Sequence, residues 1–123
     1  FFVENVDALV LRQYGQKLEH HPLFPERANI SAVQVINSTH LKMKIWERGV
    51  GKTLSCGTAA CAALVAAQLH KLAENKAVVE QPGGKLVIEW LDNGQIIMTG
   101  NVALSFQGSF EPQGFSLTRP NAE

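Results

Sequence analysis

Short stretches of alternating apolar and polar residues run along this chain, and they predict several β-strands. Residues Ile30 to Ile36 are rich in β-branched side chains, and Leu41 to Trp46 alternates Leu, Met and Ile with Lys, Lys and Trp. The Asn37-Ser38-Thr39 sequence that separates them is typical of a turn. The two strands are therefore expected to form a hairpin.

The same pattern recurs in the second half of the chain. Turn sequences at Pro82-Gly83-Gly84 and Asp92-Asn93-Gly94 separate further β-rich stretches, as expected of successive hairpins. The predicted strands are Ala77 to Glu80, Lys85 to Trp90, Gln95 to Gly100 and Val102 to Phe110. A strand is also expected to end within Phe1 to Val3.

A different pattern lies between these two groups of strands. From Gly57 the sequence is rich in alanine, which predicts a helix through about Leu72. Nearly every position from Thr58 to Ala67 is apolar, and a helix that is apolar all round is enclosed by its own fold. The predicted fold is α+β: a curved antiparallel sheet, or half-barrel, wrapped around one buried central helix.

The remaining segments predict turns and loops. Residues Val6 to Leu11 are expected to form a short helix or turn capped by Asp7, and Leu18 to Asn29 carries two prolines, as in a surface connection. From Glu111 the sequence has two more prolines and little periodicity. We therefore expect one domain over residues 1–110 and a disordered tail over residues 111–123.

Composition limits the classes of partner. The chain has 123 residues, of which 46% are hydrophobic, and eleven basic residues balance eleven acidic ones. No general charge attracts nucleic acid or an anionic membrane surface, so a small neutral partner fits better. No apolar run approaches the ~20 residues of a membrane span. Because the sequence opens on Phe1 without an initiator Met or a leader, we expect a piece of a longer chain.

The chain has two cysteines, Cys56 and Cys61. In a helix their Cα atoms lie roughly 7.5 Å apart along the axis, which makes a disulfide improbable. Cys56 falls at a strand-to-helix junction, where unpaired backbone N–H groups and the helix dipole favour a thiolate. Cys61 falls more than a turn inside the helix and is assigned to packing. By position alone, Cys56 fits core packing as well as chemistry.

Other residues near Cys56 suit an amino acid as ligand. Backbone N–H groups of Gly57, Thr58 and Ala59 form a candidate anion site for a carboxylate. Glu47 and Arg48 end a strand, and they could bind the ammonium and carboxylate of an amino acid. From the residues alone, an ordinary exposed ion pair is the better interpretation.

These residues belong to a longer signature. The sequence WERG, followed by a glycine, a threonine and CGTAACAA, resembles the second-half signature of diaminopimelate epimerases. The segments LEHHPLFPERANI, QPGGKLVIEW and MTGNVALSFQGSF resemble the family's flanking segments, so the likeness covers nearly the whole chain.

The resemblance implies an isomerase that interconverts LL- and meso-diaminopimelate in lysine biosynthesis. It implies no metal and no pyridoxal phosphate or other cofactor. Two cysteines act from opposite faces: one thiolate removes the α-proton while the other thiol delivers a proton. Bacterial members are cytoplasmic, and plant members are directed to plastids.

Carried onto this sequence, the resemblance assigns each residue a role. Cys56 is the second-half catalytic cysteine, and the backbone of Gly57 and Thr58 holds the carboxylate of the reacting centre. Glu47 and Arg48 contact the substrate. Asn29, which from the sequence alone is a turn residue, contacts the end of the substrate that does not react.

Two positions depart from the family pattern. Ala59 stands where glycine is usual, close to the proposed anion site, and Lys52 replaces the usual acid. Lys52 adds positive charge near Cys56 or is simply solvated, and we favour the second interpretation.

The first-half cysteine of the family is absent from the 123 residues, so the resemblance implies that the rest of the enzyme is a partner. The chain alone is then expected to be inactive, and an unpaired final strand could make it a homodimer. Alternatives are an isomerase of the proline racemase or phenazine-biosynthesis type, or a noncatalytic binding domain on the same scaffold.

Overall fold

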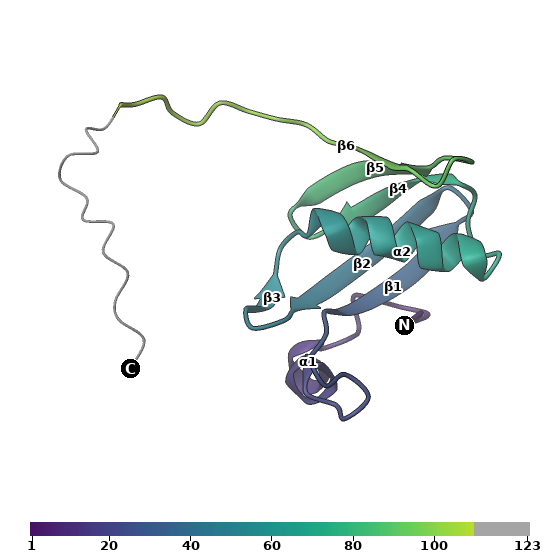
Figure 1. Cartoon of the computed structure of the whole chain (residues 1–123), viewed down its shortest axis with the longest axis vertical. Coiled ribbons are helices and arrows are strands. Elements are labelled where there is room, and N and C mark those ends of the chain that lie inside the picture. The colour runs from purple at the N-terminus through teal and green to yellow at the C-terminus, as the bar shows by residue number, and fades with distance from the viewer. Residues whose placement is uncertain (110–123) are drawn as a thin grey trace.

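The computed structural model describes residues 1–109, which form one six-stranded sheet and two helices (Figure 1). The strands follow the order β1-β2-β4-β5-β6 across the sheet, and β3 pairs with the end of β2. The helices are α1 (Arg12–Glu19) and α2 (Gly57–Leu69); the strands are β1 (Ile30–Asn37), β2 (His40–Glu47), β3 (Gly51–Thr53), β4 (Lys76–Gln81), β5 (Gly84–Trp90) and β6 (Ile96–Thr99).

The predicted hairpin of β1 and β2 is confirmed. The strands are antiparallel, with Val33 opposite Met43, and the Asn37 side chain accepts a hydrogen bond from the Thr39 N–H in the turn. Leu41, Met43 and Ile45 are buried, whereas the side chains between them are only partly covered. This alternation gives the hairpin an apolar face and a face that carries lysines.

The sheet is mixed, whereas the sequence predicted a wholly antiparallel sheet. Strand β2 pairs with β4 in parallel, with Leu41 opposite Val79, and all other strand pairs are antiparallel among the described residues. The connection between β2 and β4 contains β3 and α2. A parallel pair requires such a crossover, whereas turn sequences reveal only hairpins.

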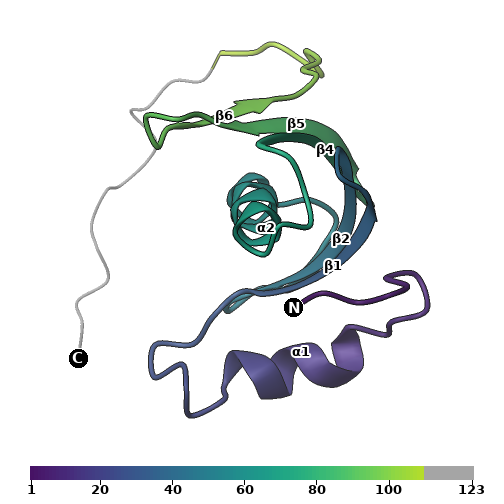
Figure 2. The same ribbon diagram turned by 90° about the vertical axis from the view of Figure 1, so that its right-hand side faces the viewer.

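Helix α2 lies in the concave face of the curved sheet, as predicted (Figure 2). Ala60, Leu64 and Ala67 are fully buried and pack with the apolar face of β2, β4 and β5. The helix is not enclosed all round, because the sheet does not close: Thr58, Ala62 and Leu69 are exposed. The helix therefore has one covered side and one open side.

Helix α1 covers the convex face of the sheet and was not predicted from the sequence (Figure 2). It packs on a second apolar cluster that includes Val6, Leu11 and Ile30. Gly15 lies against the indole ring of Trp46, where a Cβ atom would stand 2.5 Å from Cγ. Few large apolar residues mark this helix, because its close contact with the sheet is made by a glycine.

The N-terminal segment does not form the strand that was expected to end within Phe1 to Val3. Phe2 forms an isolated parallel bridge with Val33. In the turn that follows, Asn5 instead of Asp7 accepts the backbone hydrogen bonds, from the N–H groups of Asp7 and Ala8. The expected cap was therefore wrong by two residues.

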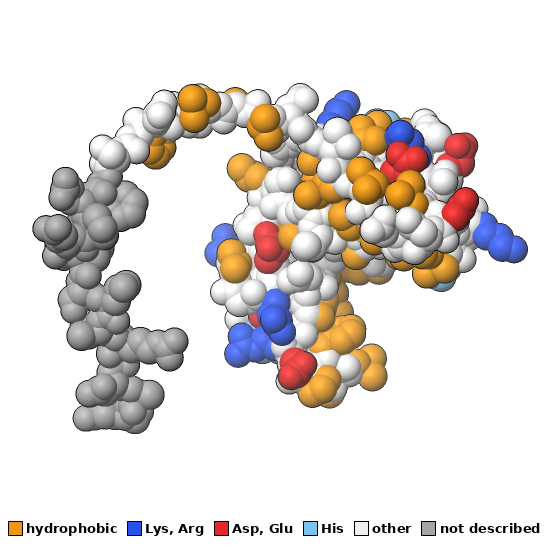
Figure 3. All heavy atoms as spheres, turned by 45° about the horizontal axis from the view of Figure 1, so that its top comes forward, with side chains coloured by type: hydrophobic (Ala, Val, Ile, Leu, Met, Phe, Trp, Pro, Cys, Tyr) orange, Lys and Arg blue, Asp and Glu red, His pale blue; other side chains and the backbone are white. Residues whose placement is uncertain are grey.

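The end of the described chain differs most from expectation. Strand β6 matches the predicted strand over Gln95 to Gly100, but residues 102–109 form no strand. Val102, Leu104 and Phe106 are 97%, 82% and 86% exposed, and apolar side chains follow this segment away from the body of the fold (Figure 3). Phe110 and the expected tail over residues 111–123 lie outside the described residues. Within the described part, neither helix is long and apolar enough to cross a membrane.

Candidate active site

Cys56 occupies the junction that the sequence predicts. It is the N-cap residue of α2, in an extended conformation with φ of −146°, three residues after β3. The side chain is half-buried, packs against the main core and forms no disulfide. Its Sγ atom lies 3.4 Å from Oγ1 of Thr58. The thiol is thus accessible from the end of the helix.

The first turn of α2 presents unpaired donors next to this thiol. The Cys56 carbonyl accepts the hydrogen bond from the Ala60 N–H, at 3.1 Å, that begins the helix. Among residues 1–109, nothing accepts a hydrogen bond from the N–H groups of Gly57, Thr58 or Ala59. Such groups carry the positive end of the helix dipole, so an anion is favoured there.

The two departures from the family pattern have different surroundings in the structure. Ala59 is 5% exposed and belongs to the main core, so its methyl group faces the sheet and not the unpaired N–H groups. Lys52 is exposed and lines a pocket with Lys42 and Lys44. Lys52 is on β3, and Gln81, which is hydrogen-bonded to Cys56, lines the same pocket.

Cys61 is a packing residue, as its position predicts. It is half-buried against the main core, and burial raises the pKa of its thiol. A thiol with a raised pKa is a poor base near neutral pH. Of the two cysteines, Cys56 is the better candidate for proton transfer.

Asn29, Glu47 and Arg48 form a second group of candidate residues, at the end of β2. The Arg48 N–H donates a 2.8 Å hydrogen bond to Oδ1 of Asn29, and the Arg48 guanidinium donates to the Glu26 carbonyl at 3.0 Å. Arg27, Ala28, Asn29 and Arg48 line a shallow cavity of about 360 Å³. The structure thus brings Asn29 and Arg48 together, although they are 19 residues apart.

Strand β3 connects this group to Cys56. Glu47 pairs with Gly51, and a Glu47 carboxylate oxygen accepts a hydrogen bond from Oγ1 of Thr53. Only Leu54 and Ser55 separate Thr53 from Cys56, so the two residues lie at most about 11 Å apart along the chain. Figure 1 shows β3 and the N-terminal end of α2 at the same end of the molecule. The end of β2 and the start of α2 are thus joined by a short stretch of chain.

Two buried polar side chains, which the sequence did not reveal as site residues, form hydrogen bonds to the chain segments that carry these groups. Glu19 is 3% exposed and accepts hydrogen bonds from Nε1 of Trp46 at 2.8 Å and from the Gly49 N–H at 2.9 Å. The Trp46 hydrogen bond, followed by that of Gly49, lowers the pKa of the Glu19 carboxyl. Glu19 thus fixes both ends of the Glu47-Arg48 turn.

Gln81 supports Cys56 in a similar way. It is 4% exposed; its Oε1 accepts a 2.7 Å hydrogen bond from the Cys56 N–H, and its Nε2 donates to the Cys56 carbonyl at 3.3 Å. The position of Gln81, a polar residue at an inward-facing strand position, is a signal that could have revealed this residue but not its partner. Glu19 ends helix α1, which the sequence did not predict, so no comparable signal marks it.

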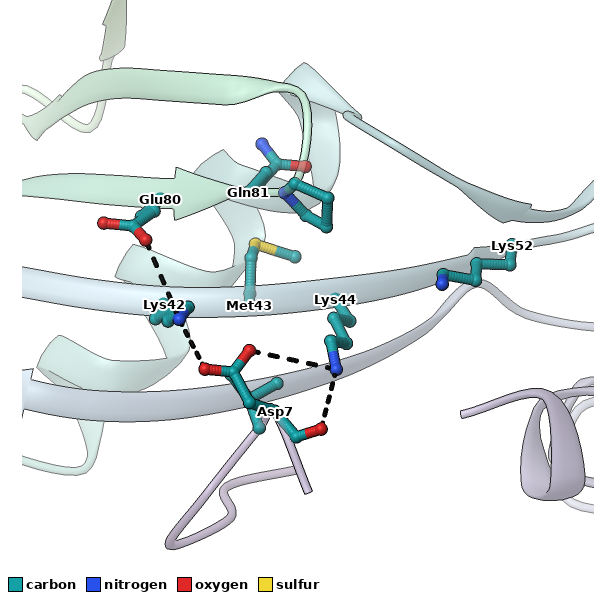
Figure 4. A pocket seen from close by; sticks show the side chains of 9 residues that line it. Asp7, Lys42, Met43, Lys44, Lys52, Glu80 and Gln81 are labelled. Carbon is teal, nitrogen blue, oxygen red and sulfur yellow. Dashed lines mark hydrogen bonds and ion pairs between the residues drawn. The ribbon is translucent and has the colours of Figure 1, made fainter. Parts of the chain in front are cut away.

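A cavity of about 390 Å³ lies over β2 and the end of β4, and Gln81 is among the residues that line it (Figure 4). Lys42 donates to the Asp7 carboxylate at 2.5 Å and lies 3.8 Å from Glu80, and Lys44 donates to the Asp7 carbonyl at 3.2 Å. The hydrogen bond between Lys42 and Asp7 lowers the pKa of the acid and raises that of the lysine. These charges join the N-terminal segment to the sheet and satisfy one another.

No group of three His, Cys, Asp or Glu side chains suited to a metal ion occurs within residues 1–109. The site described above is built from a thiol, backbone N–H groups and polar side chains.

Comparison with known proteins identifies the family. A sequence model described as diaminopimelate epimerase matches residues 1–105. The chain belongs to the diaminopimelate epimerase family. The match therefore favours the diaminopimelate epimerase family over the proline racemase and phenazine-biosynthesis types of isomerase.

Individual relatives agree. The chain is 56% identical over 108 residues to a protein of Cyanothece sp. named diaminopimelate epimerase, covering 87% of this chain and 39% of that protein. It is 53% identical over 108 residues to a protein of Oryza sativa named diaminopimelate epimerase, chloroplastic, covering 87% of this chain and 30% of the rice protein. The chain thus spans about two fifths of its bacterial relatives' length.

A solved structure supports the fold. A phenazine biosynthesis protein of the PhzF family from Bacillus anthracis aligns with a TM-score of 0.54 at 19% identity, covering 79% of this chain and 32% of that one. At this identity the likeness concerns the fold alone. It confirms the predicted half-barrel around a central helix.

Proposed function

We propose that this chain supplies one face of the active site of a diaminopimelate epimerase, in a domain of residues 1–110. The observation that carries the proposal is the half-buried Cys56 thiol at the mouth of α2, beside the unpaired N–H groups of Gly57 and Thr58. In this reaction the Cys56 thiolate takes the α-proton, or its thiol gives one, from one side of the reacting carbon. A second acid/base acts from the opposite side.

The proposed role of the backbone N–H groups follows from the charge of the reaction. Removing the α-proton places negative charge on the α-carbon and its carboxylate. Gly57 and Thr58 would donate hydrogen bonds to that carboxylate, where the helix dipole adds to their effect, and would stabilise the growing charge. No metal and no cofactor is required in this proposal.

The group at the end of β2 is proposed to hold the other end of the substrate. Asn29 has its Oδ1 engaged with the Arg48 N–H, so its amide NH₂ is the group left for a ligand. The Glu47 carboxylate keeps one oxygen beyond its bond with Thr53. The Glu47 carboxylate and the Arg48 guanidinium, which come from consecutive residues, would bind the ammonium and the carboxylate of an amino acid group.

The second acid/base must come from sequence outside these 123 residues. Cys61 is packed against the core, and its pKa is raised, so it does not fill that role. We propose that the rest of the enzyme is the partner that supplies the other face. We place the reaction in the cytoplasm, since two unpaired thiols suit a reducing compartment.

The test is a chimera in which this chain replaces the matching part of the Cyanothece relative. Incubated with LL-diaminopimelate in D₂O, the chimera should incorporate deuterium at the α-carbon and form the meso isomer. The 123-residue chain alone should do neither. The Cys56→Ala chimera should lose the exchange, and the Cys61→Ala chimera should retain it.

Two outcomes contradict the proposal. One is exchange by the isolated chain that disappears with Cys56→Ala, since one thiol would then suffice. The other is a folded chimera in which Cys56→Ala has no effect. A folded chimera that binds diaminopimelate without exchange would instead support the noncatalytic binding domain.

We also propose that the isolated chain associates with a second copy. Strand β6 is an edge strand, and Ile96, Ile97 and Met98 on it are 41%, 45% and 52% exposed. An apolar edge of this kind invites strand pairing. Sedimentation should show a dimer that Ile97→Lys weakens, whereas a monomer at all concentrations contradicts the proposal.

A further inference from the structure

Cys56 is the last residue of a segment without regular structure, residues 54–56, between β3 and α2. A side chain in such a segment has a fixed direction only if its backbone is held by other elements. Besides the Ala60 N–H bond that begins α2, three hydrogen bonds hold it, two from the Gln81 side chain at the end of β4 and one from the Gly83 N–H in the turn that follows.

The first two are those of Gln81. Its amide pairs with both backbone groups of Cys56, accepting from the N–H at 2.7 Å and donating to the carbonyl at 3.3 Å. The side chain therefore occupies the place that a neighbouring strand would fill. Because Gln81 is 4% exposed, water does not compete for these bonds.

The third bond comes from Gly83. Its N–H donates to the Leu54 carbonyl at 2.8 Å. A Cβ atom on Gly83 would stand 3.1 Å from that carbonyl oxygen and 3.1 Å from Cβ of Ser55, so the turn packs tightly on the segment. Gln81 and Gly83 thus contact all three residues of the segment that ends at Cys56.

We propose that Gln81 is a positioning residue for the Cys56 thiol. This inference rests on the proposed function of Cys56, and Gln81 touches no substrate in it. Holding the Cys56 backbone extended keeps Sγ at the mouth of α2. Because the Cys56 N–H is engaged by Gln81, the anion site is restricted to the N–H groups that follow it in the chain.

The experiment uses the 123-residue chain and both of its thiols. Iodoacetamide labels Cys56 and Cys61 at rates that mass spectrometry measures separately. Cys61 lies in the same helix, so it reports unfolding of α2, whereas Cys56 also reports opening of the segment before it. The ratio of the two rates therefore separates positioning from general destabilisation.

Gln81→Leu should raise the ratio of the Cys56 rate to the Cys61 rate by about threefold or more, because it removes both hydrogen bonds. Gln81→Glu should have a smaller effect, since it keeps an acceptor for the Cys56 N–H. The matched control is Gln34→Leu, which removes a different glutamine that accepts one backbone hydrogen bond, from Val6. It should leave the ratio unchanged.

An unchanged ratio in Gln81→Leu, or an equal rise at both cysteines, overturns the inference. Should Gln81→Leu not fold, amide hydrogen exchange of the parent chain decides instead. The Cys56 N–H should then exchange slowly while those of Gly57 and Thr58 exchange fast, and fast exchange at Cys56 overturns the inference.

A second readout connects Gln81 to the reaction. In the chimera, Gln81→Leu should lower kcat by about tenfold or more, because misplacing a reacting group affects the chemical step. The KM should change much less. If the parent chimera shows no exchange but the thiol ratio responds to Gln81→Leu, the proposed function fails and the positioning of the thiol stands.

Discussion

The indole N–H of Trp46 donates a 2.8 Å hydrogen bond to the buried carboxylate of Glu19, which also accepts the N–H of Gly49. These contacts join α1 to the turn that carries Glu47 and Arg48. A helix that the sequence did not reveal thereby determines where two candidate substrate-binding residues lie.

This carboxylate should make stability depend on pH. Because the pKa of Glu19 is lowered below 4.5 in the folded chain, its contribution is complete above pH 4.5 and is lost as the pH falls through the lower, folded pKa. Glu19→Gln should lower the urea midpoint at pH 7, and the gap from the parent should narrow progressively below pH 4.5. The exposed Glu4→Gln serves as control, and a gap that does not depend on pH argues against the assignment.

The contact between Gly15 and Trp46 predicts a helix position where alanine is harmful. Helix propensity favours alanine over glycine by about 1 kcal/mol. The added Cβ would overlap the indole ring, and overpacking costs about 1–3 kcal/mol. Gly15→Ala should therefore destabilise the chain in urea unfolding, and Gln16→Ala, on the exposed side of the same helix, should not. A Gly15→Ala chain as stable as the parent would show that the ring moves freely.

The open side of α2 predicts a contrast between two leucines. Leu64 is fully buried, so Leu64→Ala should cost about 2–5 kcal/mol in the free energy of unfolding. Leu69 is 66% exposed, so Leu69→Ala should stay within about 0.5 kcal/mol. Equal costs in the isolated chain would mean that another surface covers the open side.

Gly57 should be important for activity and not for stability. A Cβ atom there would meet Sδ of Met98 at 2.8 Å, and that flexible side chain can move away. Gly57→Ala should therefore unfold like the parent but reduce deuterium exchange in the chimera about tenfold or more, because the methyl group hinders approach to the backbone N–H. Adding Met98→Ala should not restore exchange; restoration would assign the loss to the Met98 contact.

Local patterns predicted the elements that depend on nearby residues. The β1–β2 hairpin, the start of α2 at Gly57 and the position of Cys56 all follow from alternation, turn residues and helix propensity. The parallel pairing of β2 with β4 could not be predicted, because no short-range signal accompanies it. Helix α1 was missed because Gly15, instead of a large apolar residue, makes its contact with Trp46.

The same distinction applies to the site. Cys56 and its N–H neighbours are contiguous in sequence, so a motif could identify them. Glu19 lies 30 residues from Gly49, and Gln81 lies 25 residues from Cys56. A buried polar residue signals that a partner exists, but only the three-dimensional fold shows which partner it is.

The crossover from β2 through α2 to β4 has a consequence for folding. The hairpins β1–β2 and β4–β5 close short loops and can form early, whereas the parallel pair must close a long one, at a larger cost in chain entropy. Cys56 lies inside that long loop, and Gln81 lies at its far end. Because Gln81 at the end of β4 holds the Cys56 backbone, we expect the thiol to be positioned only after the two hairpins have joined across α2.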